Sequence, residues 1–211
     1  TLKIVVRENL GKLRTHSEQA LLQLGTSVVV YKEVGFSRLL QLLQDIHAQS
    51  HTRKVHPDYA QALDSFMPPR ERGYQAPARF CTLVRGMLDR THDIGLSHSM
   101  VRLNMLDQMP HVDALRACHT SRDGDLFTAD HEAIYVFLFA CREPDVELAL
   151  RRVFALPLTQ LFTSQATDCS APGIRAMTDH LQETLRKGVP DYSALLADAS
   201  APPAAVLVNS S

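Results

Sequence analysis

The sequence lacks several features that would identify a protein class. Its 211 residues include no tryptophan, only 6% aromatic residues and four cysteines, at positions 81, 118, 141 and 169. The cysteines are far apart and form no Cys-x-x-Cys pair, which predicts free thiols in a reducing compartment rather than a secreted disulfide framework. No apolar run approaches the roughly 18 residues of a membrane-spanning helix. We therefore expect an intracellular protein, cytoplasmic or nuclear, without a membrane span.

The charge balance excludes a strongly basic surface. There are 22 Lys and Arg residues against 23 Asp and Glu residues, for a formal net charge of -1. This balance disfavours nucleic acid as a partner, because neutralisation of phosphates dominates the affinity of most nucleic-acid-binding domains. An RNA-binding helical domain is the alternative if Arg70, Arg72, Arg151, Arg152 and Lys54 lie on one face.

The strong catalytic signatures are also absent. The sequence contains no GxxxxGK[ST] phosphate loop, no GxGxxG, no HExxH, no GxSxG and no EF-hand loop. Each of these motifs has a physical role in holding a phosphate, a metal ion or a nucleophile. Their absence favours a protein that is not an enzyme and that needs no cofactor.

What the sequence does contain is apolar residues at helical spacing. Residues 36–46 form one such stripe, and prolines 57, 77, 110, 144 and 157 suit the first turns of further helices. A last long helix is expected from about Ile174 to Gly188. A helix is also expected to begin near Ser97, with Met100, Leu103 and Leu106 among its apolar residues.

The most hydrophobic segment, Ala133 to Cys141 (AIYVFLFAC), is apolar on every side. A helix of this kind belongs at the centre of a bundle. The pattern therefore predicts a mainly α fold, a compact multi-helix bundle or irregular helical-repeat domain. We expect one domain over residues 1–198, followed by a loosely ordered Ala/Pro-rich tail at 199–211.

Three short segments are rich in β-branched residues instead. They cover residues 2–6, 27–31 and 205–208. They predict a small accessory β-sheet, although Val28 to Val30 would also suit a buried helix, since periodicity does not separate the two over so few residues.

The most specific motif is His92-Asp93-Ile94-Gly95. It resembles the HDIG signature of HD-domain phosphohydrolases, an all-helical family whose His and Asp ligands hold divalent metals. The resemblance extends to an upstream His51 in an H-T-x-x-V context and to a later Asp130. It implies a metal site of His51, His92, Asp93 and Asp130, where a bound metal ion would generate a hydroxide nucleophile. Pro57 departs from this pattern, because it would interrupt the helix after His51.

A structural zinc site is a second metal hypothesis. Cys118, His119 and another Cys or His are its candidate ligands. Adjacent residues on a helix point in different directions, and zinc ligands normally come as closely spaced pairs. Both sites compete with the simpler interpretation that these residues occupy turns or the core.

The function that we expect first is a non-enzymatic helical protein–protein interaction or scaffold domain. The chain begins at Thr1, which suggests a domain excised from a larger intracellular protein. Its expected partner is another protein, with self-association as one form of that contact. The metal-dependent phosphohydrolase and the RNA-binding domain are the alternatives.

Overall fold

The computed structural model describes residues 2–9, 15–48 and 58–197. These residues form two compact units, where we expected a single domain over residues 1–198. Unit 1 consists of Thr1–Pro68 and Asp89–Leu96, and unit 2 of Pro69–Leu88 and Ser97–Ser211. The expected tail at 199–211 lies outside the described residues.

The described residues of unit 1 form two short strands and three helices. In chain order they are β1 (Val5–Glu8), α1 (Thr15–Gln23), β2 (Val28–Tyr31), α2 (Phe36–Ala48) and α3 (Tyr59–Phe66). β1 and β2 pair in parallel, with Val5 opposite Val28. The segment expected at 27–31 therefore contains a strand, while the one expected at 2–6 overlaps β1 only at Val5 and Val6. Their β-branched side chains suit a pleated, partly buried surface. The third, 205–208, is not among the described residues.

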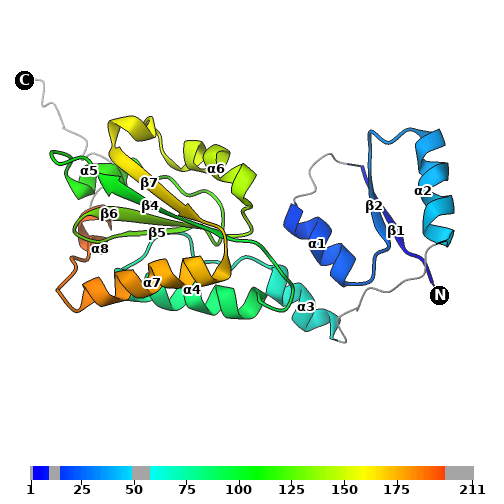
Figure 1. Ribbon diagram of the computed structural model, residues 1–211, viewed down its shortest axis with the longest axis horizontal. Coiled ribbons are helices and arrows are strands. Elements are labelled where there is room, and N and C mark those ends of the chain that lie inside the picture. The colour runs from blue at the N-terminus through cyan, green and yellow to red at the C-terminus, as the bar shows by residue number, and fades with distance from the viewer. Residues whose placement is uncertain (1, 10–14, 49–57, 198–211) are drawn as a thin grey trace, which may run out of the picture. The chain divides into compact units, whose positions relative to one another are not determined.

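Unit 2 is built on a five-stranded mixed sheet (Figure 1). Its strands are β3 (Gly73–Tyr74), β4 (Ser99–Met105), β5 (Leu126–Ala129), β6 (Ala133–Leu138) and β7 (Phe162–Asp168). Their order is β3-β5-β6-β4-β7, and every pair is antiparallel except β3 with β5.

Helices cover both faces of this sheet. The long helices α4 (Pro77–Thr91) and α7 (Ala171–Leu185) lie side by side on one face (Figure 1) and are joined by an ion pair between Arg85 and Asp179. α5 (His111–Arg116) and α6 (Val146–Val153) lie on the other face. α8 (Ser193–Ala197) and two short 3-10 helices, η1 (Glu143–Asp145) and η2 (Leu158–Gln160), complete the unit.

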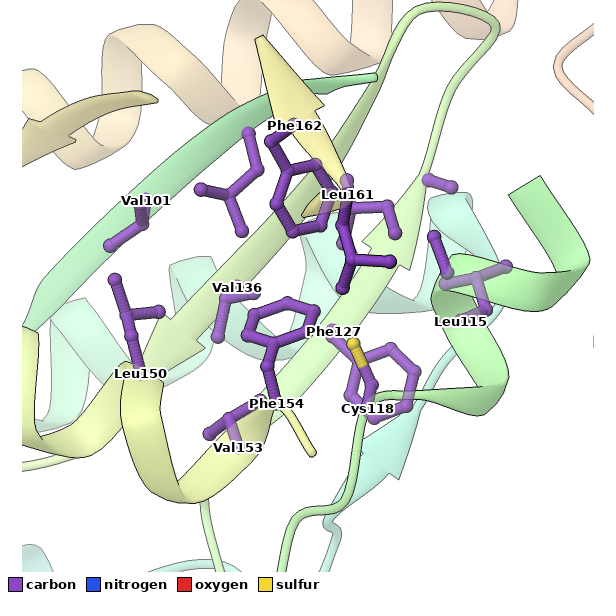
Figure 2. Packing of buried hydrophobic residues seen from close by; sticks show 14 of the residues in the cluster. Val101, Leu115, Cys118, Phe127, Val136, Leu150, Val153, Phe154, Leu161 and Phe162 are labelled. Atoms are coloured by element: carbon purple, nitrogen blue, oxygen red, sulfur yellow. The ribbon is translucent and has the colours of Figure 1, made fainter. Parts of the chain in front are cut away.

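The main core lies between the sheet and the face that carries α5 and α6. Figure 2 shows side chains of the sheet, among them Val101 and Val136, packed with Leu115 of α5 and Leu150 of α6. Each of these four side chains is at most 1% exposed. Burial of this apolar surface is the dominant stabilising contribution to unit 2.

The prediction of a mainly α bundle is wrong: the fold is mixed α/β. The segment expected as the central helix, Ala133 to Cys141, contains strand β6, and the helix expected from Ser97 is strand β4. The physical reason is that helices cover both faces of the sheet. β6 is buried on both faces and apolar at every position, as a buried helix is, so it lacks the alternation that marks a half-buried strand. β4 does alternate from Val101 to Met105, with Arg102 and Asn104 partly exposed, and the helix prediction overlooked this period of two.

Among the helices of the described residues, none is both long and apolar enough to span a membrane.

Candidate functional site

The turn that precedes β5 brings an arginine and an aspartate together. It is formed by Arg122, Asp123, Gly124 and Asp125, called here the Arg122 turn. Gly124 has a φ of 86°, in the left-handed region that favours glycine. A Cβ there would lie 2.8 Å from Cβ of Phe139. Only glycine therefore lets this turn lie so close to the end of β6.

Arg122 and Asp125 both bind the main chain of Phe139. Nη2 of Arg122 donates to the Phe139 carbonyl at 2.9 Å, and the Phe139 N–H donates to Oδ1 of Asp125 at 3.0 Å. Nε of Arg122 lies 3.6 Å from Oδ2 of Asp125; the Asp125 side chain is 4% exposed and the Arg122 side chain 29%. These contacts with Phe139 and the buried Asp125 orient the guanidinium, while part of it stays accessible to solvent.

The residue after Phe139 is strained. Ala140 has a φ of 50°, which is uncommon for a residue other than glycine. Its N–H donates to Nδ1 of His98 at 3.1 Å, and the buried His98 ring packs on Phe137 and Phe139 at centroid distances of 5.3 and 4.9 Å. Backbone strain of this kind often accompanies functional sites. Here it fixes the strand end to which Arg122 is bonded.

A second arginine reaches the same turn. Nη1 of Arg72 lies 3.6 Å from the carboxylate of Asp123, and both side chains are more than half exposed. Exposed ion pairs of this kind contribute little stability. Arg72 can therefore exchange its partner for an anionic ligand at small cost.

Arginine chemistry indicates what such a site can bind. The planar guanidinium matches phosphate groups, and it matches the acceptor edge of guanine. The nearby Cys141 is not an activated nucleophile: burial raises the pKa of its thiol to about 11, so this thiol stays protonated near neutral pH. Arginines placed in this way can bind a phosphate or the acceptor edge of guanine.

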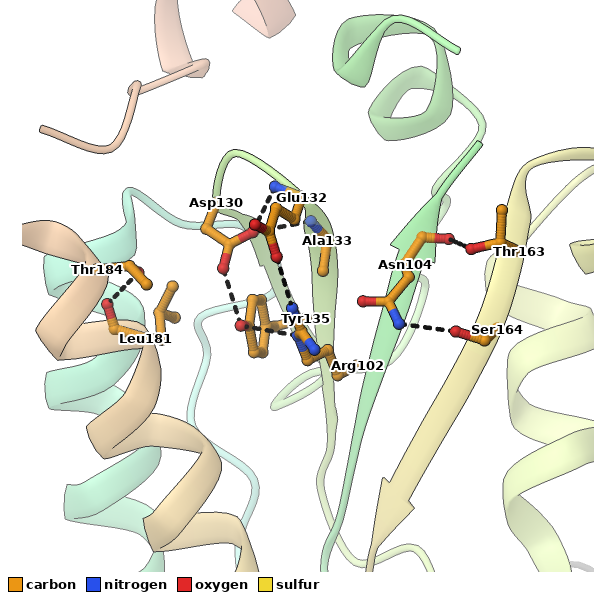
Figure 3. Close-up of polar contacts among 10 residues, drawn as sticks. All are labelled: Arg102, Asn104, Asp130, Glu132, Ala133, Tyr135, Thr163, Ser164, Leu181 and Thr184. Atoms are coloured by element: carbon orange, nitrogen blue, oxygen red, sulfur yellow. Dashed lines mark hydrogen bonds and ion pairs between the residues drawn. The ribbon is translucent and has the colours of Figure 1, made fainter. Parts of the chain in front are cut away.

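The hairpin between β5 and β6 contains a second polar network (Figure 3). Oδ1 of Asp130 accepts the N–H groups of Glu132 and Ala133, and Oδ2 accepts the Tyr135 hydroxyl at 2.9 Å. Nε of Arg102 donates to the same hydroxyl oxygen. Burial and the Asp130 carboxylate raise the Tyr135 pKa well above its usual value. Both Asp130 oxygens are therefore engaged in holding the hairpin.

Three of the four predicted metal ligands lie among the described residues. His92 and Asp93 are exposed in the turn that follows α4, in unit 1, whereas Asp130 is buried in unit 2. Across residues 2–9, 15–48 and 58–197, no three His, Cys, Asp or Glu side chains are grouped as metal ligands. His51 is not described, so the four-ligand site stays a prediction.

The other candidate residues are placed as follows. Cys118 is buried in the core and its backbone bridges to Phe154, so its thiol has a packing role. Arg70 and Arg72 precede β3, Arg151 and Arg152 lie on α6, and Lys54 is outside the described residues.

The sequence analysis did not single out Arg122 and Asp125. The available signal was two acidic residues and an arginine around a glycine directly before an apolar run. That signal is common in surface turns, and the decisive partner, Phe139, comes 17 residues after Arg122.

Comparison with known proteins identifies both parts of the chain. A family model described as "BcsE, degenerate GGDEF domain" matches residues 76–208, and one described as "BcsE, degenerate REC domain" matches residues 1–73. The boundary between the two matches falls at β3, close to the first boundary between the units.

Curated relatives carry the name cyclic di-GMP binding protein BcsE. The protein of Klebsiella pneumoniae is 33% identical over 165 residues, that of Salmonella typhimurium 31% over 165 residues and that of Escherichia coli 30% over 168 residues. Each match covers 78% of this chain and 32% of the relative. The chain thus spans about a third of their length. Because these relatives are bacterial, the nuclear part of the expected localisation does not apply.

Proposed function

This chain belongs to the BcsE family, and from that membership we propose that it binds cyclic di-GMP without turning it over. The name of the relatives supports the choice of ligand. The Arg122 turn is the proposed contact site, and the bacterial cytoplasm the proposed location, which suits the four free cysteines.

The assignment of the site rests on one observation: contacts with Phe139 and Asp125 hold the Arg122 guanidinium in place, while part of it remains accessible to solvent. Its Nη2 and Nε face Phe139 and Asp125, while Nη1 is bonded by none of the described residues. A guanidinium that is already oriented loses less side-chain entropy on binding a ligand. Such pre-organisation favours a specific ligand over a merely solvated arginine.

The chemistry of the ligand fits the turn. Cyclic di-GMP presents two phosphates and two guanine bases. An arginine can bind the O6 and N7 acceptors of guanine or a phosphate. The buried Asp125 carboxylate, 3.6 Å from Nε of Arg122, keeps the guanidinium oriented for this contact. Arg72, whose ion pair with Asp123 is exposed, is available for a phosphate.

Two features support binding without catalysis. The five-residue string Gly-Gly-Asp-Glu-Phe, which gives the GGDEF class its name, occurs nowhere in the sequence. In the β5–β6 hairpin, the Asp130 carboxylate is engaged by two backbone N–H groups and the Tyr135 hydroxyl. It therefore serves the hairpin rather than a substrate.

The test is calorimetric titration of the chain with cyclic di-GMP. Replacing Arg122 with alanine should remove a charge-assisted contact worth about 1–3 kcal/mol, which weakens binding roughly 5- to 150-fold. Arg85→Ala is the matched control: it removes another ion-paired arginine, on α4, and should leave affinity unchanged.

Cyclic di-AMP serves as the ligand control. Adenine has an amino group where guanine has O6, so an arginine that reads guanine should discriminate against it. Full affinity of Arg122→Ala for cyclic di-GMP would show that the ligand binds elsewhere. Absence of binding to the unaltered chain would overturn the proposed function itself.

A further inference from the structure

Strand β7 leaves one edge of the unit 2 sheet open. It pairs with β4 on one side, and none of the described residues forms a strand on its other side. Residues 163–167 are all exposed, whereas Phe162 is buried. An open edge presents a row of backbone N–H and C=O groups to which another strand can bind.

The opposite edge of the same sheet is different. It is formed by β3, which is only two residues long and is followed within three residues by Pro77 at the start of α4. Short length and a nearby proline are common ways to protect a sheet edge. β7 is seven residues long, and its sequence FTSQATD has no proline and no charge before Asp168.

One end of β7 is irregular. The pairing with β4 shifts between Asn104 and Met105, so that Thr163 is an extra residue in β7. Figure 3 shows how this bulge is held: the Thr163 hydroxyl donates to the Asn104 carbonyl, and the Asn104 side chain donates to the Ser164 hydroxyl. A bulge protects its own end of an edge. The regular, open stretch is therefore Ser164–Asp168.

We propose that Ser164–Asp168 of β7 pairs antiparallel with the same stretch of a second copy of this chain. Full overlap about a two-fold axis places Ala166 opposite itself, Gln165 opposite Thr167 and Ser164 opposite Asp168. No like charges meet in this register, and a hydroxyl faces the one carboxylate. The stretch is thus complementary to itself, and a single two-fold contact closes both open edges at once.

The size of the contact sets its strength. Five residues a side bury far less than the roughly 1,200–2,000 Å² of a stable protein interface. The association is therefore weak and depends on concentration. It does not require the Arg122 turn, so it stands apart from the proposed binding of cyclic di-GMP.

The experiment is sedimentation velocity of the 211-residue chain over a concentration series, with charges introduced at the two-fold axis. Ala166→Lys places two lysines opposite each other, and Ala166→Glu two glutamates; each should weaken self-association by up to about fivefold. An equimolar mixture of the two variants pairs lysine with glutamate and should recover it. Ala176→Lys, on the exposed face of α7, adds the same charge away from the edge and should associate as the unaltered chain does.

Three results would overturn the proposal. The unaltered chain could stay monomeric throughout the series, which would leave the edge for a strand of another protein. It could associate equally well with either charge at position 166, which would place the contact on another surface. The mixture could fail to associate while both variants keep the melting temperature of the Ala176→Lys control, which would exclude the two-fold register.

Discussion

The strands of the two units differ in how much protein covers them. In unit 2, every residue of β5 and β6 is buried, and helices lie on both faces of the sheet. In unit 1, only Glu8 of β1 and Val29 and Val30 of β2 are buried. Isolated two-stranded sheets are marginal, and parallel strands are normally covered on both faces. The described part of unit 1 therefore contributes much less stability from its own contacts than unit 2 does.

The helices show the same contrast. α2 carries Phe36, Leu40 and Leu43 along one face, and these side chains are 73%, 44% and 41% exposed. In unit 2, Leu150 of α6 is fully buried against the sheet. An amphipathic helix gains most of its stability from packing its apolar face. The comparison predicts that substitutions of similar size have very different costs in the two units.

The largest effect is expected at the centre of unit 2. Phe137 of β6 is fully buried and packs against His98. Phe137→Ala should cost about 3–5 kcal/mol of unfolding free energy, because it removes buried surface and leaves a cavity. Urea unfolding, followed by hydrogen exchange in peptides of each unit, measures this loss. A cost below about 1 kcal/mol would contradict the assignment of the stable core to this sheet.

An intermediate effect is expected where α7 begins. Ser170 caps the helix by accepting the Gly173 N–H, and Asp168 accepts the N–H and the hydroxyl of Ser170. A Cβ on Gly173 would overlap the Asp168 carboxylate. Gly173→Ala should therefore destabilise unit 2 by about 1–3 kcal/mol, as overpacking does.

The matched control for this substitution is Gly86→Ala. Gly86 lies inside α4 with nothing within 4 Å of an added Cβ. Gly86→Ala should raise the unfolding free energy of unit 2 by about 0.5–1 kcal/mol, because glycine is a poor helix former. If the two substitutions change the melting temperature equally, the overlap between an added Cβ at position 173 and the Asp168 carboxylate does not affect stability.

The smallest effect is expected in unit 1. Phe36→Ala should change its stability by less than about 0.5 kcal/mol, since the side chain is largely exposed. Ile46→Ala, on the same helix but 9% exposed, should cost about 2 kcal/mol or more. Hydrogen exchange of α2 and β2 peptides distinguishes the two. A loss above 1 kcal/mol for Phe36→Ala would mean that this face of α2 is packed in solution.

Sequence reasoning succeeded for the helices with an exposed face. Residues 36–46 show the helical stripe of α2, and Pro77 marks the first residue of α4. It failed for β6, because this strand is buried on both faces and carries no alternation. It failed for β4 for another reason: the helix prediction overlooked the alternation of Val101, Leu103 and Met105 with the polar Arg102 and Asn104. Over six or seven residues, a buried strand and part of a buried helix have the same composition.

The candidate site was harder to predict for a different reason. Arg122 and Asp125 lie in a turn around Gly124, but their proposed role depends on Phe139 and His98. These partners meet the turn only because β6 pairs with both β5 and β4. Pairing between strands is long-range information, which local periodicity does not contain.

The hydrogen bond from the Ala140 N–H also determines the chemistry of His98. A ring nitrogen can accept a hydrogen bond only when it carries no proton, so Nδ1 is the imine nitrogen and the neutral imidazole carries its hydrogen on Nε2. Nitrogen-15 NMR distinguishes this tautomer from the other. The His98 ring can therefore report on the strand end that holds Arg122, without any label at the turn itself.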